Sequence, residues 1–308
     1  MRRYLLVLFM MIMIPYITTL AWTGKLETAE WHITKDSTVI VERNEISAEQ
    51  TVEDYLVHVL AAQIPAEFEA ETLKAQAILA RTYIYSLLGT SGKIYEEELD
   101  MDALSIEQMK TLWEETDYPA RLQKLQAAVN ETAGLYLIYE GEMIEPLYCY
   151  ASAGKTRSRS EDYPYLKQTE SPGDLLAENY RSLPVFEMKD FARRIHEIPG
   201  SAAVSEEELI NGGGIQIVER DSSGYVKLVQ IGQKTYTGEE VQYALGLASS
   251  CYSFERLDRK IRVICKGIGH GFGFSQFGAN EMAKEGASYE ELLHHYFQNV
   301  EIIGVEEK

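Results

Sequence analysis

Basic residues are scarce in this chain of 308 residues, which holds 29 Lys and Arg against 48 Asp and Glu and has a formal net charge of −19 at pH 7. Proteins that bind duplex DNA, RNA or an anionic membrane surface use surplus Lys and Arg to contact phosphate. The deficit therefore argues against nucleic acid as a partner. A basic, neutral or zwitterionic ligand is easier to accommodate.

Cysteine is also rare, and the three residues Cys149, Cys251 and Cys265 cannot all pair with one another. A Cys251–Cys265 bridge is open to an exported protein, but the spacing does not require it. Nucleotide-binding glycine motifs are missing too. In the run "GIGHGFGFSQFGA", which starts at Gly267, neither register supplies the third glycine of G-x-G-x-x-G, and no Gly-Lys-Ser/Thr follows.

A long apolar run stands at the start of the chain, where Arg2 and Arg3 precede the segment Tyr4–Trp22. This run is long enough to cross a bilayer as a helix, despite Pro15. No clean small-x-small cleavage site follows it. We therefore expect residues 1–22 to be an uncleaved single-pass anchor in the cell membrane, with residues 23–308 on the extracytoplasmic side. A cleaved signal peptide is the alternative.

Residues 23–308 mix strand and helix patterns, which predicts an α+β fold in one compact unit. Alternating apolar residues predict strands near 37–44, 135–152 and 215–232, and a last strand after the helices near the C-terminus. Spacings of three and four predict a helix from Val52, capped by Thr51 and ended by Pro65, then helices over about 69–88, around 122–129 and around 239–245. The acidic run "YEEELDMD" at 95–102 is expected to be a solvated insertion, and residues 154–183 a long loop region.

Glycine alternates with other residues at 267, 269, 271 and 273, which permits positive φ or very close backbone approach. A tight structural turn would explain the glycines. It would not explain His270, Ser275 and Gln276 in one loop that opens onto a helix, so a ligand-contacting loop is the competing interpretation.

Spacing alone does not assign a function to two further pairs of residues. Lys74 and Arg81 share a face of the second helix, where a solvated face is the simple interpretation. His294 and His295 point about 100° apart on a helix and do not chelate one metal together. No metal site and no cofactor is predicted.

Five segments together resemble the stage II sporulation protein D family of peptidoglycan lytic transglycosylases. They are "VEDYLVHVLAAQIPAEFEAETLKAQAILARTY", "SAGKTRS", "RDSSGYVKLVQIG", "TGEEVQYALGLASS" and "GIGHGFGFSQFGANEMAKEGASYEELLHHYF". The resemblance runs in order from about residue 35 to residue 303. It implies a sporulation protein that acts on peptidoglycan glycan strands during engulfment. It also names candidate partners: a cell-wall amidase and an integral membrane protein of the engulfment machinery.

The resemblance implies cleavage between N-acetylmuramic acid and N-acetylglucosamine without water, giving 1,6-anhydro ends. One glutamic acid would protonate the leaving oxygen and then take the proton of the 6-hydroxyl. The aligned residue here is Gln63, an amide that cannot give up a proton at usable pH. Glu67, Glu69 and Glu71 follow closely and are possible substitutes if one reaches the same point in space.

The resemblance also assigns substrate-binding positions. Lys74, Arg81 and Tyr296 match positions important for activity in the family, and His270, Ser275 and Gln276 lie in the glycine loop. Some members hold zinc with a histidine and a cysteine five residues earlier; this chain has Cys149 and Ile144 there, so that site is not expected.

Two hypotheses follow from the sequence. In the first, the protein is a lytic transglycosylase in which another carboxylate replaces Gln63. In the second, it is a membrane-anchored peptidoglycan-binding or scaffolding member that has lost catalysis.

Overall fold

The computed structural model describes residues 33–34, 36–43, 46–88, 91–201, 204, 206–210 and 214–305. The predicted anchor at residues 1–22 lies outside these ranges. Among the described residues, no helix has both the length and the apolar content that crossing a bilayer requires. The anchor and the extracytoplasmic placement therefore stay predictions.

The described elements mix helices and strands along the whole chain, which confirms the mixed α+β composition. The helices are α2 (Val52–Gln63), α3 (Ala70–Leu88), α4 (Ile106–Glu131), α5 (Met188–His196), α6 (Glu206–Ile210), α7 (Gly238–Leu245), α8 (Gln276–Lys284) and α9 (Tyr289–Tyr296), with the 3-10 turns η1 (Glu96–Glu98) and η2 (Pro172–Leu176).

The strands form several small sheets. Their bounds are β1 (Thr38–Arg43), β2 (Ile46–Thr51), β3 (Lys93–Tyr95), β4 (Leu135–Tyr139), β5 (Glu142–Met143), β6 (Tyr148–Cys149), β7 (Arg181–Ser182), β8 (Val185–Glu187), β9 (Ile215–Arg220), β10 (Val226–Ile231), β11 (Lys234–Thr237), β12 (Tyr252–Leu257), β13 (Lys260–Lys266), β14 (Phe274–Ser275) and β15 (Glu301–Gly304). The sheet orders are β2-β1-β3, β11-β10-β9, β12-β13-β7 with β8 beside β13, β14-β6, and β15-β4-β5.

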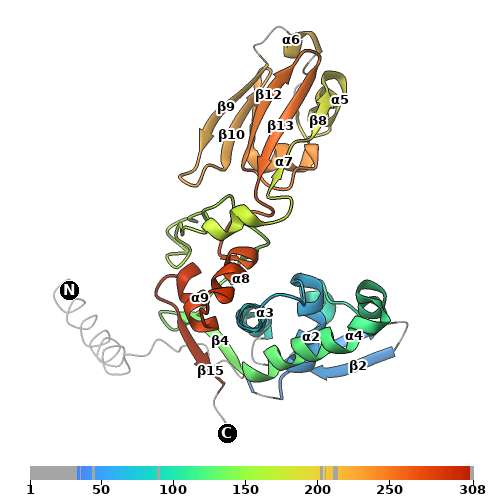
Figure 1. The fold of residues 1–308 in the computed structure, drawn as a ribbon, viewed down its shortest axis with the longest axis vertical. Coiled ribbons are helices and arrows are strands. Elements are labelled where there is room, and N and C mark those ends of the chain that lie inside the picture. The colour runs from blue at the N-terminus through green and yellow to red at the C-terminus, as the bar shows by residue number, and fades with distance from the viewer. Residues whose placement is uncertain are drawn as a thin grey trace, which may run out of the picture.

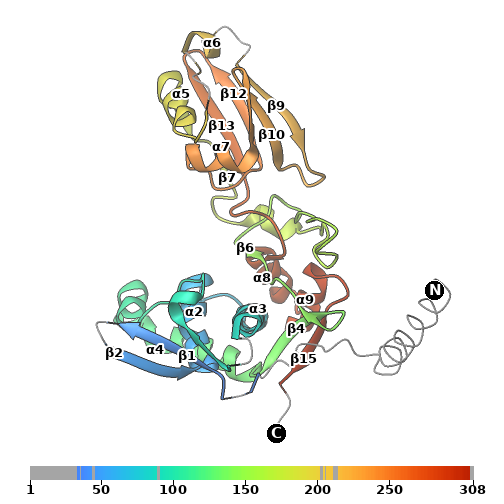
Figure 2. The same ribbon diagram turned by 180° about the vertical axis from the view of Figure 1, so that it is seen from behind.

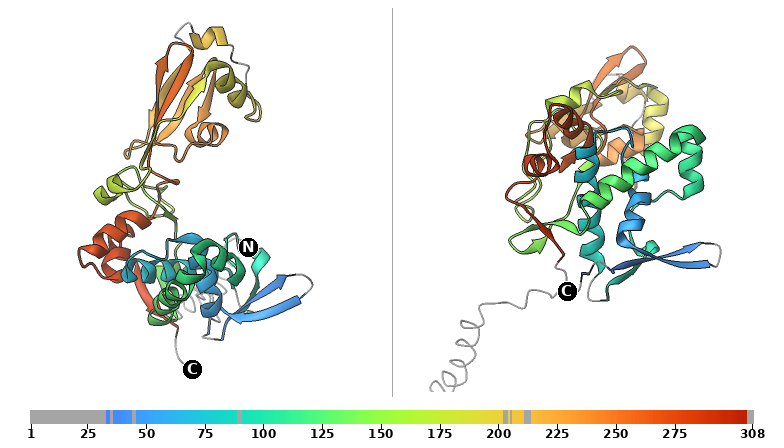
Figure 3. Two further views of the ribbon diagram at one scale, coloured as in Figure 1. Left: turned by 45° about the vertical axis from the view of Figure 1, so that its right-hand side comes forward. Right: turned by 60° about the horizontal axis from the view of Figure 1, so that its bottom comes forward.

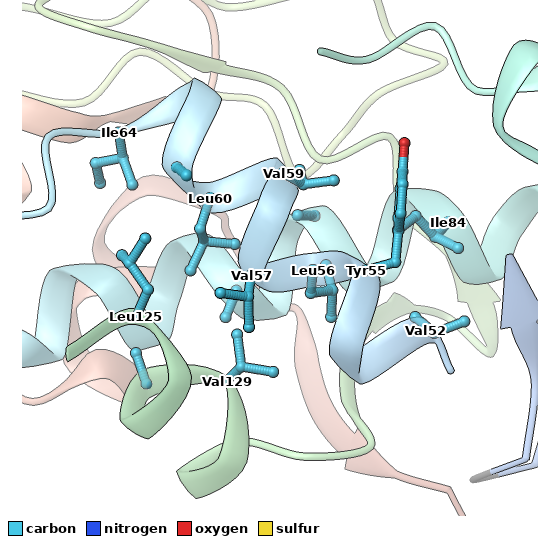
Figure 4. Close-up of a cluster of buried hydrophobic side chains, with 14 of the residues drawn as sticks. Val52, Tyr55, Leu56, Val57, Val59, Leu60, Ile64, Ile84, Leu125 and Val129 are labelled. Carbon is cyan, nitrogen blue, oxygen red and sulfur yellow. The ribbon is translucent and has the colours of Figure 1, made fainter. Parts of the chain in front are cut away.

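Helices α2 and α3 form as their sequence predicts. The Thr51 hydroxyl accepts a hydrogen bond from the Asp54 backbone N–H at 3.0 Å and caps α2. The helix ends at Gln63, two residues before Pro65, whose ring cannot continue it. Apolar side chains of α2 pack against α3 and α4 in one cluster, part of which Figure 4 shows.

Helix α3 is buried along most of its length because two hydrophobic clusters meet on it. Leu73, Ala77 and Ile84 face the cluster with α2 and α4. Ile78 and Leu79 face a second cluster built by β4, α8 and α9. The C-terminal helices therefore pack beside a helix some 200 residues earlier in the sequence, as Figures 1 and 2 show.

Strands β7–β13 form a separate region with α5, α6 and α7. In all three ribbon figures this region lies apart from helices α2, α3 and α4. Its core is a third cluster with its own members, among them Phe191, Val229 and Val263. The predicted strand pair around the turn at 222–224 and the short helix before Gly246 are both present. Helix α5 and strand β12 are present as well, although no sequence pattern predicted them.

Segment 154–183 is mostly irregular, as expected, and connects the two regions (Figure 2). The three cysteines are free and buried, so Cys251 and Cys265 do not form the bridge that the sequence left open. The Cys251 thiol instead contacts the Gly224 carbonyl, and the Cys265 thiol contacts the Ser249 carbonyl.

Candidate functional site

One cleft of about 540 Å³ lies between the end of α2, the side of α3 and the glycine loop. Its volume falls in the range of about 300–1,000 Å³ typical of small-molecule sites. Leucine, alanine, methionine and proline side chains form its apolar surface. Its polar lining comes from five separate parts of the sequence: Gln63, Tyr83, Asp100, Asp102, Glu145, Tyr148 and His270.

Gln63 is the last residue of α2 and is half-buried on the cleft wall. Gln76 Nε2 donates to Gln63 Oε1 at 2.9 Å. Gln276 Nε2 donates to the Gln63 backbone carbonyl at 3.0 Å and to Gln76 Oε1 at 3.2 Å. These bonds fix the direction of each amide. Within the described part of the chain, Gln63 Nε2 donates to no protein atom, so it is available to a ligand in the cleft.

His270 reaches the same cleft from the glycine loop. The Phe272 backbone N–H donates to His270 Nδ1 at 3.0 Å, which places the proton of a neutral ring on Nε2. Burial of the ring lowers the His270 pKa, and the nearby cation of Arg157 lowers it further. A hydrogen bond from the ring to the Tyr148 backbone opposes this fall in pKa and ties the ring to the segment of Tyr148.

The glycines of this loop are required for both reasons that the sequence suggested. Gly271 and Gly273 have φ of +80° and +70°, values that L side chains rarely adopt. A Cβ at Gly273 would also lie 2.0 Å from the Leu147 carbonyl oxygen, and one at Gly271 would lie 2.3 Å from the Tyr225 hydroxyl oxygen. The loop can therefore lie directly against the segment that contributes Tyr148 to the cleft.

Arg157 holds the glycine loop in place. Its Nε donates to Asp221 at 2.6 Å, and its Nη1 donates to Glu239 at 3.0 Å and to the His270 carbonyl at 3.2 Å. The guanidinium also stacks 4.3 Å from the centre of the Phe272 ring. Since Asp221 and Glu239 belong to the sheet region, Arg157 ties that region to the cleft.

Three carboxylates line the cleft, and the sequence did not identify them as site residues. Glu145 pairs with Arg159 Nη1 at 2.5 Å. Asp100 and Asp102 have no ion pair or hydrogen bond among the described residues. The run that contains them was interpreted as a solvated insertion. Local spacing holds no signal for them, because Asp100, Met101 and Asp102 all line the cleft and the segment turns at Asp100, where the Met101 N–H donates to the Leu99 carbonyl at 2.8 Å.

Lys74 and Arg81 lie away from the cleft lining. Lys74 Nζ contacts Glu71 and Glu131, each at 2.7 Å. The Arg81 side chain is 0% exposed and forms a two-bond ion pair with Glu53, at 2.8 and 2.6 Å. Its remaining bonds go to two backbone carbonyls. These contacts support a role for Arg81 in holding the fold.

Ser275 and Tyr296 are also buried inside the protein. Ser275 Oγ donates to Asp174 at 2.8 Å, and Ser152 donates to the same carboxylate through its backbone N–H at 2.9 Å. The Tyr296 hydroxyl shares a hydrogen bond of 2.9 Å with Ser171. Burial raises the pKa of Asp174, and the serine hydrogen bonds oppose that rise. These residues join the glycine loop to segment 152–174.

The glutamates suggested as substitutes for Gln63 do not line the cleft. Glu67 lies 3.5 Å from Arg121, and Glu71 is bound by Lys74 and by the Tyr289 backbone N–H. Glu69 is exposed. The substitution of one of these three for the missing acid therefore has no support in the contacts that they make.

In the part of the chain that the structure describes, no three His, Cys, Asp or Glu side chains gather closely enough to hold a metal ion. Cys149 is buried beneath the glycine loop, and burial raises the pKa of its thiol to about 12.

Comparison with known proteins shows which family this chain resembles. A family model described as stage II sporulation protein (SpoIID) matches residues 42–139, which include Gln63, Asp100 and Asp102. The chain is 32% identical over 265 residues to stage II sporulation protein D of Bacillus amyloliquefaciens, covering 82% of this chain and 74% of that protein. It is 31% identical over 266 residues to stage II sporulation protein D of Bacillus subtilis strain 168, with the same coverage. A protein of the same strain named amidase enhancer is 24% identical over 290 residues, covering 78% of this chain and 39% of that protein.

Proposed function

Because the chain belongs to the stage II sporulation protein D family, we propose that it works at the cell wall during engulfment and that its cleft binds a glycan strand of peptidoglycan. The strand is cleaved between N-acetylmuramic acid and N-acetylglucosamine, which leaves a 1,6-anhydro end. The protein does this from the outer side of the cell membrane, held there by residues 1–22.

The observation that carries this proposal is that Gln63 and His270 line the same cleft, although 206 residues separate them in the sequence. Gln63 presents an N–H donor to the cleft, and His270 and Tyr83 lie on the same surface. A glycan without stem peptides is rich in acceptor oxygens and has apolar ring faces. Such a ligand matches a cleft with N–H donors, tyrosines and an apolar floor.

The proposed reaction also needs a group that gives and then takes a proton. Gln63 cannot do this, because a carboxamide releases no proton at usable pH. Losing a general acid typically costs about 10²- to 10⁴-fold in rate. Cleavage therefore requires one of the other carboxylates on the cleft wall.

A second candidate function is glycan binding without cleavage. It is favoured by the amide network of Gln63, since Gln63 Nε2 can donate to a glycosidic oxygen as a protonated glutamic acid would, and then keep its proton. A member of this kind would help a cell-wall amidase find its substrate. The similarity to a protein named amidase enhancer supports this alternative.

Product analysis separates the two. The full chain is incubated with glycan strands freed of stem peptides, and 1,6-anhydro ends are measured by mass spectrometry. The proposal predicts such ends in excess of a heat-denatured control. Strands that sediment with the protein but show no new ends would favour the binding function. Absence of both products and binding would contradict the assignment of the cleft.

A further inference from the structure

We propose that Asp102 is the carboxylate that transfers the proton in place of Gln63. This inference rests on the proposed cleavage of a glycan strand in the cleft. It adds a catalytic residue that aligned motifs do not point to, since it lies in the acidic run after η1 and far from position 63 in the sequence.

The choice begins with the carboxylates on the cleft wall, which among the described residues are Asp100, Asp102 and Glu145. Glu145 is already engaged by the protein, because Arg159 Nη1 donates to it at 2.5 Å. Arg159 is held in turn over the Tyr163 ring, 3.8 Å from its centre. The remaining candidates are the two aspartates.

The aspartate segment is fixed to the helix that carries Gln63. Leu99 is buried in the cluster around α2. The Leu104 backbone N–H donates to the His58 carbonyl at 3.0 Å, and the His58 ring Nδ1 lies 2.6 Å from the Leu104 carbonyl. His58 is five residues before Gln63, or about 7.5 Å along an α-helix. Both ends of the segment are therefore anchored, and its carboxylates keep a fixed position relative to Gln63.

Asp102 differs from Asp100 in what it faces. Burial raises the Tyr148 pKa to about 12, and the negative charge of Asp102 contributes to the rise. Asp102 thus lies within electrostatic range of the Tyr148 hydroxyl. Tyr148 pairs through β6 with Phe274 of β14, directly after the glycine loop. Asp102 is also two residues from Leu104, which hydrogen-bonds to His58 of α2, whereas Asp100 is four residues away, so Asp102 is the aspartate tied more closely to the helix that carries Gln63.

Asp102 is open to the space that a bound sugar would fill. Its side chain lines the cleft and is exposed to water in the unliganded protein. A sugar in the cleft displaces this water, so the carboxylate then meets the glycan directly.

The proposed step is balanced within the enzyme and the glycan. Asp102 donates its proton to the glycosidic oxygen as the bond from that oxygen to C1 of the muramic acid breaks. The 6-hydroxyl oxygen of the same sugar forms the new bond to C1, and its proton passes to the Asp102 carboxylate. Asp102 ends protonated as it began, and no water or other reactant is consumed. Gln63 Nε2 orients the glycosidic oxygen by a hydrogen bond.

The test uses the full chain and four variants, with initial rates of 1,6-anhydro end formation and sedimentation with insoluble peptidoglycan as separate readouts. Asp102→Asn should lower the rate by about 10²- to 10⁴-fold and leave sedimentation unchanged. Glu97→Gln, in the same acidic run but outside the cleft lining, is the matched control and should keep the wild-type rate. Asp100→Asn should lose less activity than Asp102→Asn.

The fourth variant, Gln63→Glu combined with Asp102→Asn, separates proton transfer from a structural effect. A glutamic acid at position 63 supplies another proton donor, so the double variant should cleave at least about tenfold faster than Asp102→Asn alone. Asp102→Asn with the wild-type rate, or a loss that Glu at position 63 does not restore, overturns the assignment of Asp102 and leaves the proposed function standing. Sedimentation without products from the wild type overturns cleavage and the assignment together.

Discussion

The buried pair of Arg81 and Glu53 offers a quantitative test of which matched residues hold the fold. Arg81→Met keeps most of the side-chain volume and removes the charge. It leaves the Glu53 carboxylate with the Gly134 backbone N–H, at 3.1 Å, as a donor, and it leaves the Leu135 and Val129 carbonyls without the guanidinium.

The cost follows from the burial of the two partners. Removing one partner of a buried ion pair typically costs about 3–5 kcal/mol, because the other charge is left without compensation. The Arg81 side chain is 0% exposed, but that of Glu53 is 22% exposed, so water can solvate the stranded carboxylate in part. We therefore expect the lower end, about 3 kcal/mol. For a chain of this size, that corresponds to a fall in Tm of about 5 °C.

Thermal unfolding followed by circular dichroism measures the fall, and sedimentation with peptidoglycan below the transition measures binding. Arg81→Met should lower Tm without weakening binding. The double variant Arg81→Met with Glu53→Gln removes the stranded charge and should recover part of the loss. An unchanged Tm together with weakened binding would refute this reasoning, because it would show that Arg81 contacts the glycan.

Three further predictions concern single positions. Gln63→Glu should give a rate of 1,6-anhydro end formation at least as high as that of the wild type, because a glutamic acid at position 63 would be a second proton donor beside Asp102. Its Tm should be unchanged, because a carboxylate oxygen accepts from Gln76 as the amide oxygen does. A clear fall in rate would contradict the placement of position 63. Gly273→Ala should lower the free energy of unfolding, measured in urea, by clearly more than Gly286→Ala does. Both glycines have positive φ, but only a Cβ at Gly273 would lie against backbone, 2.0 Å from the Leu147 carbonyl oxygen. Equal losses would contradict this account of the glycine loop. Lys74→Met should destabilise the protein at pH 7 and have little effect above pH 12. Hydrogen bonds to Glu131 and Glu71 raise the Lys74 pKa from 10.5 to about 12, so the stabilisation by Lys74 is complete below pH 10.5 and is lost as the pH rises through about 12. A destabilisation that is independent of pH would exclude these ion pairs as its source.

Local patterns predicted much of the fold, because capping, apolar spacing and turn residues are decided by near neighbours. The cap at Thr51 and the end of α2 before Pro65 are examples. Helix α4 shows the limit. The pattern predicted its second half, around Leu122–Val129, whereas the helix assignment runs from Ile106 through a kink at Glu114. The early part has Ile106, Met109 and Trp113 at helical spacing and a capping box at Ser105, but the non-helical backbone of Glu114 separates it from the half that was predicted.

The candidate site was predicted in part. Gln63 and His270 were named from motifs, and they share the cleft. The aspartates were not, because their role depends on the Leu104–His58 contact, which brings the acidic run onto α2 and has no trace in local spacing. For Arg81 the prediction from spacing was wrong. The spacing suggested a solvated face, but the side chain is buried and forms an ion pair with Glu53 of another helix, α2.

The most direct test of the account is a crystal structure of the protein with a bound glycan fragment that lacks stem peptides. The account predicts a sugar linkage inside the cleft, with Gln63 Nε2 and one oxygen of Asp102 within hydrogen-bonding distance of the bridging oxygen, at about 2.7–3.2 Å. A glycan bound on the sheet region, or one in the cleft whose linkage lies beyond the reach of both side chains, would contradict it.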